Sequence, residues 1–153
     1  MPVWRDAPLW SCPKCGAQLV TRNMSHACGP YTVDSFLADK GPRGRELFAR
    51  FVELVESCGP VIPAPAKTRV AFMVRVRFAG VDRLTERSLA AHFGLPYALP
   101  AHPRVRKIDY YPPSWYVHNV RVTSVDELDE ELRGWLCASY RLMGEQRRFD
   151  QSR

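Results

Sequence analysis

Four side chains that bind metal ions well lie close together near the start of the chain. Cys12 and Cys15 form a C-x2-C pair, and His26 and Cys28 follow as an H-x-C pair. In a C-x2-C pair a tight turn aims two thiolates at one ion, and Gly16 can take the positive φ that such a turn uses. Three thiolates and one imidazole complete a tetrahedron with no open position, which is typical of structural zinc. We therefore expect a structural Zn2+ held by these four residues.

Other interpretations of the cysteines stay open. Cys58 could replace His26 as a ligand, or the clustered thiols could be reduced and packed in a core, although this stretch has little else to bury. A redox role would need a helix next to the C-x2-C pair, and no helix pattern begins there. The chain has five cysteines, and Cys58 and Cys137 stand alone within helix-like patterns. We expect those two to be small buried apolar residues rather than part of a disulfide framework.

The basic charge of the chain is concentrated in its middle. Residues 67–107 contain nine Lys or Arg and two Asp or Glu, hence +7, whereas all 153 residues together carry +6. A local surplus of this kind favours an anionic partner, most commonly nucleic acid. The alternative is a solvated basic face that only keeps the protein in solution.

The periodicity predicts an α+β domain with a small, mostly antiparallel sheet and flanking helices. Apolar residues recur at helical spacing in 42–58 and 125–143, and a short helix is expected after Thr32. Alternation predicts strands at 69–78, 88–95 and 115–123. We expect a connector at 60–67 and a long loop at 96–115, because both are rich in proline.

Local signals place the helix ends. Thr32 can cap the first helix, Pro42 suits the first position of the second, and Gly59 can stop it. Ser124 followed by Glu127 predicts a capping box at the start of the last helix.

The strand predictions give the sheet a basic outer side. Arginines alternate with apolar residues along 69–78, and His92 lies opposite the apolar side of 88–95. Guanidinium groups suit phosphates, and exposed aromatic rings can stack on unpaired bases. The predicted anion-binding residues are Lys67, Arg69, Arg75, Arg77, His92 and Arg121, with Asn119 on the same side.

Three groups near this surface have simpler explanations. The aromatic residues between 110 and 116 could cap the core beneath the loop. His118 falls on the apolar side of its strand, so we interpret it as a buried, hydrogen-bonded histidine. Asp82 and Glu86 could bind a divalent ion, but we expect them to pair with Arg83 and Arg87 instead.

Motifs of common enzymes are missing from the sequence. It has no Gly-rich phosphate loop, no G-x-S-x-G and no acidic pair set with a lysine as in nucleases. An enzyme or phosphate-ligand domain with a pocket near His92 is one alternative to a polyanion-binding module. A protein-interaction module is the other alternative, and it would instead present an apolar patch in which Trp4, Leu9 and Trp10 dock on a partner.

Three segments of the chain together resemble a known family. They are WSCPKCGAQLVTRNMSHACGPYTVDSFL, PAKTRVAFMVRVRFAGV and VHNVRVTSVDELDEELRGWLCASY. They resemble a bacterial family catalogued as domain of unknown function 5655 (DUF 5655), over Trp10 to about Tyr140. Asn23 and the H-x-C pair match the family pattern, whereas Met24 stands where glutamine is usual. The resemblance implies a small α/β domain with a zinc-ribbon-like N-terminal knuckle and implies no activity.

Together these patterns predict a zinc knuckle at 1–31, an α+β domain at 32–143 and a mobile basic tail at 144–153. No apolar run is long enough to span a bilayer and no signal peptide is visible, so we expect a cytoplasmic protein without membrane contact. The function that we predict is binding of nucleic acid or another polyanion through the basic sheet face, not catalysis.

Overall fold

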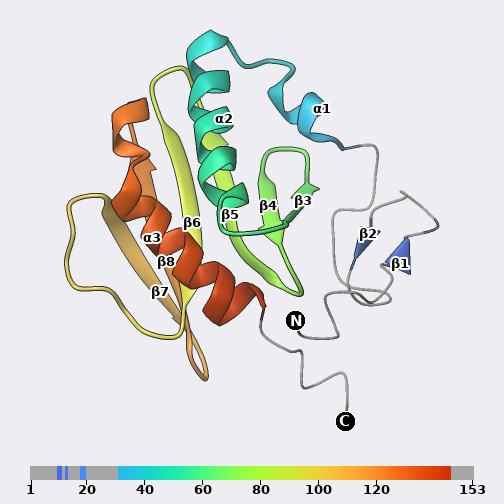
Figure 1. Cartoon of the computed structure of the whole chain (residues 1–153). Coiled ribbons are helices and arrows are strands. Elements are labelled where there is room, and N and C mark those ends of the chain that lie inside the picture. Colours follow the sequence, from blue (N-terminus) through green and yellow to red (C-terminus); the bar gives the residue numbers. More distant parts are fainter. Residues whose placement is uncertain (1–9, 12, 14–17, 20–30, 146–153) are drawn as a thin grey trace.

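The computed structural model describes residues 10–11, 13, 18–19 and 31–145, and its main body is a six-stranded antiparallel sheet with helices (Figure 1). The strand order is β3-β4-β5-β6-β8-β7, so only the last two strands are out of sequence order. A separate two-stranded pair joins Trp10–Ser11 to Gln18–Leu19. The predicted α+β class with a mostly antiparallel sheet and flanking helices is confirmed. The elements are β1 (Trp10–Ser11), β2 (Gln18–Leu19), α1 (Val33–Leu37), α2 (Pro42–Glu56), β3 (Ile62–Pro65), β4 (Val70–Met73), β5 (Arg77–Leu84), β6 (Leu89–Leu95), β7 (Val105–Tyr111), β8 (Trp115–Val122), a 3-10 turn (Val125–Glu127), α3 (Glu130–Ser139) and a π-helical turn (Tyr140–Gly144).

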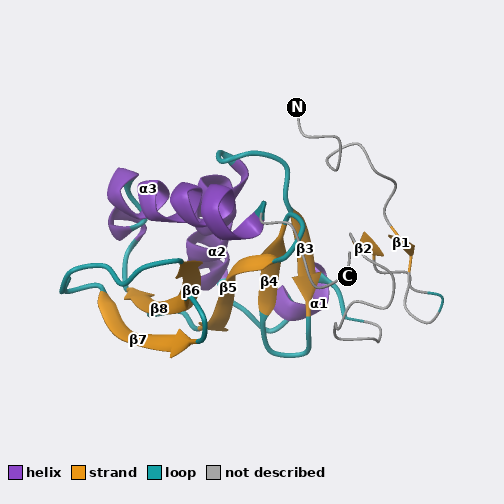
Figure 2. Cartoon of the chain, turned by 90° about the horizontal axis from the view of Figure 1, so that it is seen from below, coloured by secondary structure: helices purple, strands orange, loops and turns teal. Residues whose placement is uncertain are grey.

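The two long helices lie on the same side of the sheet. Figure 2 shows α2 and α3 above the strands, and the short α1 lies beside β3. The hydrophobic core fills the space between these layers and includes Phe51, Leu136 and Phe93, which are fully buried. We call the side of the sheet that faces away from α2 and α3 the open face.

The first two helices begin where the sequence predicts. Thr32 accepts a hydrogen bond from the Ser35 backbone N–H at 2.9 Å and caps α1. Pro42 is the first residue of α2, whose apolar stripe buries Leu47, Phe48 and Phe51 as expected. Both signals are local, so the sequence alone was sufficient to find them.

The predicted capping box at the last helix is wrong. Ser124 makes no side-chain cap bond and precedes only the 3-10 turn, while Glu127 accepts from the backbone N–H of Thr123 at 2.6 Å. Asp129 is the true cap of α3, because it accepts from the Leu132 N–H at 3.1 Å. The cap therefore sits five residues later than predicted, after the 3-10 turn.

The single strand predicted at 69–78 is in fact a hairpin. β4 ends at Met73 and β5 begins at Arg77, with a turn between them. The backbone N–H groups of Arg75 and Val76 both donate to the carbonyl of Gly144, at 2.9 and 3.2 Å. These partners lie far away in the sequence, so alternation along 69–78 could not reveal the turn.

Two further strands lie in segments predicted to be irregular. β7 lies in the expected loop and pairs with β8, and β3 lies in the expected connector and pairs with β4. A register shift between Val105 and Lys107 interrupts the alternation of β7. Both are edge strands of the sheet, where proline and charged residues are tolerated because one side makes no ladder.

The prediction that Cys58 and Cys137 are small buried apolar residues outside any disulfide framework is also wrong. Their sulfur atoms form a disulfide that links the segment after α2 to α3, 79 residues away in the sequence. Cys58 lies just after α2 and Cys137 lies within α3, so the pairing depends on how the two helices meet. Isolated positions in the sequence cannot show this.

Candidate functional site

The strand register brings several predicted residues into one row across the open face. Gly80 of β5 pairs with His92 of β6, His92 pairs with Asn119 of β8, and Asn119 pairs with Lys107 of β7. His92 alternates with the buried Ala91 and Phe93, as expected, so its side chain belongs to the open face. The predicted second and third strands are therefore confirmed together with the outward position of His92.

His92 is held by a carboxylate and seated above a glycine. Its Nδ1 lies 2.7 Å from Oδ2 of Asp82, and its side chain is 25% exposed. A Cβ added to Gly80 would lie 2.8 Å from Cε1 of the ring, so only glycine leaves room for the imidazole. The Nε2 atom has no hydrogen-bond partner within the described part of the chain. Asp82 therefore fixes the ring and leaves one nitrogen available to a ligand.

Three arginines form the next row of the open face. Arg83 and Arg121 each pair with Ala90 of β6, one from either side, and Arg69 immediately precedes β4 at the same level of the sheet. Two strand spacings separate the backbones of Arg83 and Arg121 by about 10 Å. We call Arg69, Arg83 and Arg121 the cationic row.

The cationic row is only weakly neutralised by acidic residues. Among the described residues, Arg83 and Arg121 have no carboxylate partner and both are exposed. Arg69 is 64% exposed and reaches Asp82 only at 3.9 Å. Lys67, in the turn before β4, is likewise exposed. Lys107 differs, because its Nζ lies 3.0 Å from Asp109, which also accepts from Asn119.

Only four of the six predicted anion-binding residues lie on or beside the open face. Lys67, Arg69, His92 and Arg121 lie on or beside it, but Arg75 lies in the β4–β5 turn and Arg77 starts β5 next to that turn. Both are half-buried, and each has interactions of its own. Arg83 was not predicted, because a register shift between Val81 and Arg83 moves it onto the open face. Only pairing with β6 reveals that shift.

Aromatic rings occupy the opposite end of the open face. Trp115 pairs with Tyr111 across β8 and β7. A Cβ at Gly94 would lie 2.9 Å from two ring atoms of Trp115, so the indole covers that glycine as His92 covers Gly80. Tyr111 is 55% exposed. We call Tyr111 and Trp115 the aromatic end.

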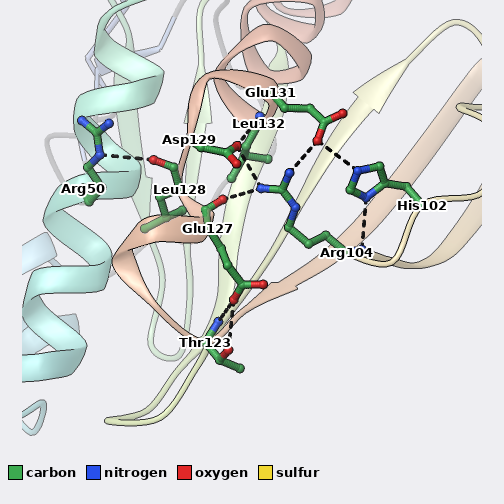
Figure 3. Close-up of polar contacts among 9 residues, drawn as sticks. All are labelled: Arg50, His102, Arg104, Thr123, Glu127, Leu128, Asp129, Glu131 and Leu132. Carbon is green, nitrogen blue, oxygen red and sulfur yellow. Dashed lines mark hydrogen bonds and ion pairs between the residues drawn. The ribbon is translucent and has the colours of Figure 1, made fainter.

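A second polar cluster lies on the helix side of the sheet (Figure 3). Arg104 precedes β7, donates to Asp129 at 2.9 Å and to Glu131 at 2.6 Å, and also bonds the carbonyl of Glu127. Its guanidinium lies 5.7 Å from the ring of Trp135. His102 contacts the same Glu131 carboxylate at 3.0 Å. No sequence pattern predicts this cluster, because His102 and Arg104 fall in the segment predicted to be a loop.

Ion pairing sets the protonation of this cluster. Burial alone would lower the pKa of Arg104, but its bonds to Asp129 and Glu131 outweigh burial and raise that pKa. Burial alone would raise the pKa of Asp129, and the hydrogen bond from Arg104 instead lowers it. The pKa of Glu127 is lowered mainly by the backbone N–H of Thr123. Arg104 and Asp129 are thus held in their charged forms by each other.

The prediction that His118 is a satisfied core histidine is confirmed. It is fully buried and stacks on Phe93 with ring centroids 5.1 Å apart. Its Nε2 accepts from the Leu99 N–H at 3.0 Å, so Nδ1 carries the hydrogen and donates to the Tyr116 carbonyl. Burial lowers the pKa of His118, which keeps the ring neutral.

Asp82 and Glu86 neither meet nor pair with Arg83 and Arg87. Asp82 holds His92, whereas Glu86 accepts from the backbone N–H groups of Arg43 and Gly44 and thereby caps α2. Glu86 also borders a shallow pocket of about 150 Å³ between the start of α2 and the segment after β8. That pocket includes neither His92 nor any residue of the cationic row.

The predicted zinc ligands Cys12, Cys15, His26 and Cys28 lie outside the described residues. Within the described ranges, no group of three or more His, Cys, Asp or Glu residues is placed to hold a metal ion. None of the described helices is both long and apolar enough to cross a membrane.

Comparisons with protein-family models, with curated proteins and with solved structures find no match to this chain. The resemblance to family 5655 therefore stays an expectation, and the function has to be inferred from the geometry of the open face.

Proposed function

We propose that this protein binds nucleic acid or another polyanion through the open face of its sheet. The observation that carries the proposal is the cationic row, in which Arg83 and Arg121 project from β5 and β8 and Arg69 stands just before β4. Among the described residues, the one ion pair of this row joins Arg69 to Asp82 at 3.9 Å. Guanidinium groups bind phosphate oxygens in a fork geometry and release counterions when they do so. His92, with Nε2 available, adds a further contact in the adjoining row.

The spread of the cations across the sheet, from the start of β4 to β8, favours an extended ligand over a small one. An extended ligand with regularly spaced negative charges fits a row of cations on a sheet better than a small enclosed substrate does.

The first test measures binding to single-stranded oligonucleotides, duplex oligonucleotides and heparin at increasing salt concentration. Fluorescence anisotropy reports the binding. We expect affinity to fall steeply between about 50 and 200 mM salt. The double variant Arg83→Ala/Arg121→Ala should bind more weakly, and its log–log salt slope on a single strand should be smaller by about 1.4.

The matched control is Arg43→Ala/Arg141→Ala, which removes the same charge from exposed positions away from the open face. We expect its slope and affinity to stay close to those of the parent protein. Equal losses in both double variants would mean that net charge alone drives binding, and absence of binding at low salt would overturn the proposal.

We propose in addition that Cys12, Cys15, His26 and Cys28 hold a structural Zn2+. The support is the ligand set and its spacing, together with the antiparallel pairing of Trp10–Ser11 with Gln18–Leu19, which brackets the C-x2-C pair. Protein purified under reducing conditions should contain about one zinc per chain by mass spectrometry. Loss of that zinc in Cys12→Ser/Cys15→Ser, with Cys58→Ser as the control, would support the proposal; metal-free parent protein would contradict it.

A further inference from the structure

We infer that the polyanion is a single-stranded nucleic acid whose bases stack on the aromatic end while its phosphates follow the cationic row. This inference rests on the proposed function and adds the class of ligand to it. The open face carries two different chemistries at its two ends, and a polymer with alternating rings and phosphates complements both.

The two ends lie on one continuous strand. Along β8 the open-face residues are Trp115, Val117, Asn119 and Arg121, since they alternate with the buried His118, Val120 and Val122. Six residues of strand separate Trp115 from Arg121 by about 20 Å. A ligand that touches both must therefore be extended, as an unpaired strand of several nucleotides is.

The floor of the open face is made of small residues that bring rings close to the backbone. Gly94 lies beneath Trp115, Gly80 lies beneath His92, and Ala90 separates Arg83 from Arg121. Because these positions have little or no side chain, planar groups can lie low on the sheet and present a surface to solvent. Aromatic rings in such positions stack on bases of any sequence.

Tyr111 lies on the open face, and its neighbour Tyr110 is a matched tyrosine that lies on the other face and cannot contact the same ligand. It is 55% exposed and belongs to the open face, where it pairs with Trp115. The adjacent Tyr110 is 51% exposed but lies on the other side of β7, where its ring meets that of Tyr116 at 4.8 Å. Tyr116 in turn pairs with the buried Leu95, so this side faces the helices. The two tyrosines match in type and exposure and differ in face.

A duplex cannot use the aromatic end, because its bases are stacked on one another and its outer surface is phosphate and sugar. A polyanion without bases, such as heparin, can use only the cationic row. The aromatic end therefore predicts a preference for single strands that charge alone does not give.

The experiment compares four ligands at one salt concentration. Three are single strands of equal length and charge, namely oligothymidylate, oligouridylate and an abasic oligonucleotide with the same backbone as oligothymidylate. The fourth is a blunt duplex of the same length. We expect both strands that carry bases to bind roughly 10-fold or more tightly than the abasic strand. A preference between thymidylate and uridylate would reflect either the C5 methyl group of thymine or the sugar, and oligodeoxyuridylate separates the two.

The outcomes separate this inference from the proposed function. If the abasic strand or the duplex binds as tightly as oligothymidylate, base stacking is overturned while polyanion binding stands. If none of the four binds at low salt, both the inference and the proposed function fail.

Variants then locate the stacking surface. Tyr111→Ala should weaken oligothymidylate binding several-fold and leave abasic binding unchanged, while Tyr110→Ala should change neither. Trp115→Leu should act in the same direction as Tyr111→Ala, and Trp115→Phe should restore most of the affinity because it keeps a ring. Circular dichroism and melting curves show whether each variant is folded. Equal effects of Tyr110→Ala and Tyr111→Ala in folded proteins would overturn the inference.

Discussion

Two neighbouring arginines show how differently the two sides of the sheet use the same side chain. The backbone N–H of Arg121 donates to the carbonyl of Arg104 at 3.3 Å, so the two residues are adjacent in space. Arg104 faces the helices, is 12% exposed and has two carboxylates and a carbonyl as partners. Arg121 lies on the open face, exposed and without a carboxylate partner among the described residues.

The difference indicates which cations hold the fold together and which are available to a ligand. A guanidinium that already meets two carboxylates gains little from phosphate, because those bonds would have to break first. An unpaired, exposed guanidinium exchanges only water and counterions when it binds. The +7 of residues 67–107 is thus not one basic surface, since Arg104 belongs to a closed ion-pair cluster.

The largest effect that separates the two sides is on stability. Arg104→Ala should lower the free energy of unfolding by about 2 kcal/mol, because it leaves Asp129 and Glu131 without their shared partner and frees the Glu127 carbonyl. Arg121→Ala should change stability by less than about 0.5 kcal/mol, as expected for an exposed residue without partners. Urea unfolding measures both.

Binding to oligonucleotides should show the reverse order. Folded Arg104→Ala protein should keep the affinity of the parent, and Arg121→Ala should lose several-fold. The distinction between the two sides breaks down if Arg104→Ala costs nothing in stability, or if it reduces binding as much as Arg121→Ala does.

The same contrast explains what the sequence could and could not predict. Alternation in 88–95 and 115–123 found β6 and β8 and placed His92 and Arg121 outward, because one face of each strand is buried. Thr32 and Pro42 placed helix starts through bonds within a few residues.

What the sequence missed depends on partners distant in the chain. The turn at Arg75 and Val76 relies on Gly144, the outward position of Arg83 on a register shift against β6, and the Arg104 cluster on carboxylates at the start of α3. The disulfide likewise needs α2 and α3 to pack together before Cys58 can reach Cys137. None of these leaves a periodic pattern in the sequence.

An intermediate effect concerns the buried histidine on the helix side. Burial lowers the pKa of His118 in the folded chain. As the pH falls through about 6.5, the unfolded chain therefore binds a proton at this histidine while the folded chain keeps it neutral. The free energy of unfolding should therefore fall as pH drops below about 6.5, by at most about 1.4 kcal/mol per pH unit.

His118→Gln should reduce this dependence, since glutamine does not titrate and can still accept from the Leu99 N–H. Comparing urea unfolding of the parent and the variant at pH 7.5 and about 5.5 isolates the histidine from other titrating groups. Identical pH profiles would show that His118 does not carry the dependence.

The smallest expected effect compares one glycine from each side. Gly134 lies in α3 with nothing within 4 Å of an added Cβ, so Gly134→Ala should stabilise the protein by about 0.5–1 kcal/mol through helix propensity. An added Cβ at Gly94 would meet the Trp115 ring at 2.9 Å, so Gly94→Ala should instead displace the indole. The melting temperature should rise for Gly134→Ala and stay level or fall for Gly94→Ala.

Oligothymidylate binding should weaken only in Gly94→Ala, because only that substitution moves a ring of the aromatic end. If Gly94→Ala is as stable as the parent and binds equally well, Trp115 is not seated on Gly94 in a way that matters to the ligand. The open face would then act through its cations alone, and the contrast between the two sides of the sheet would reduce to paired against unpaired arginines.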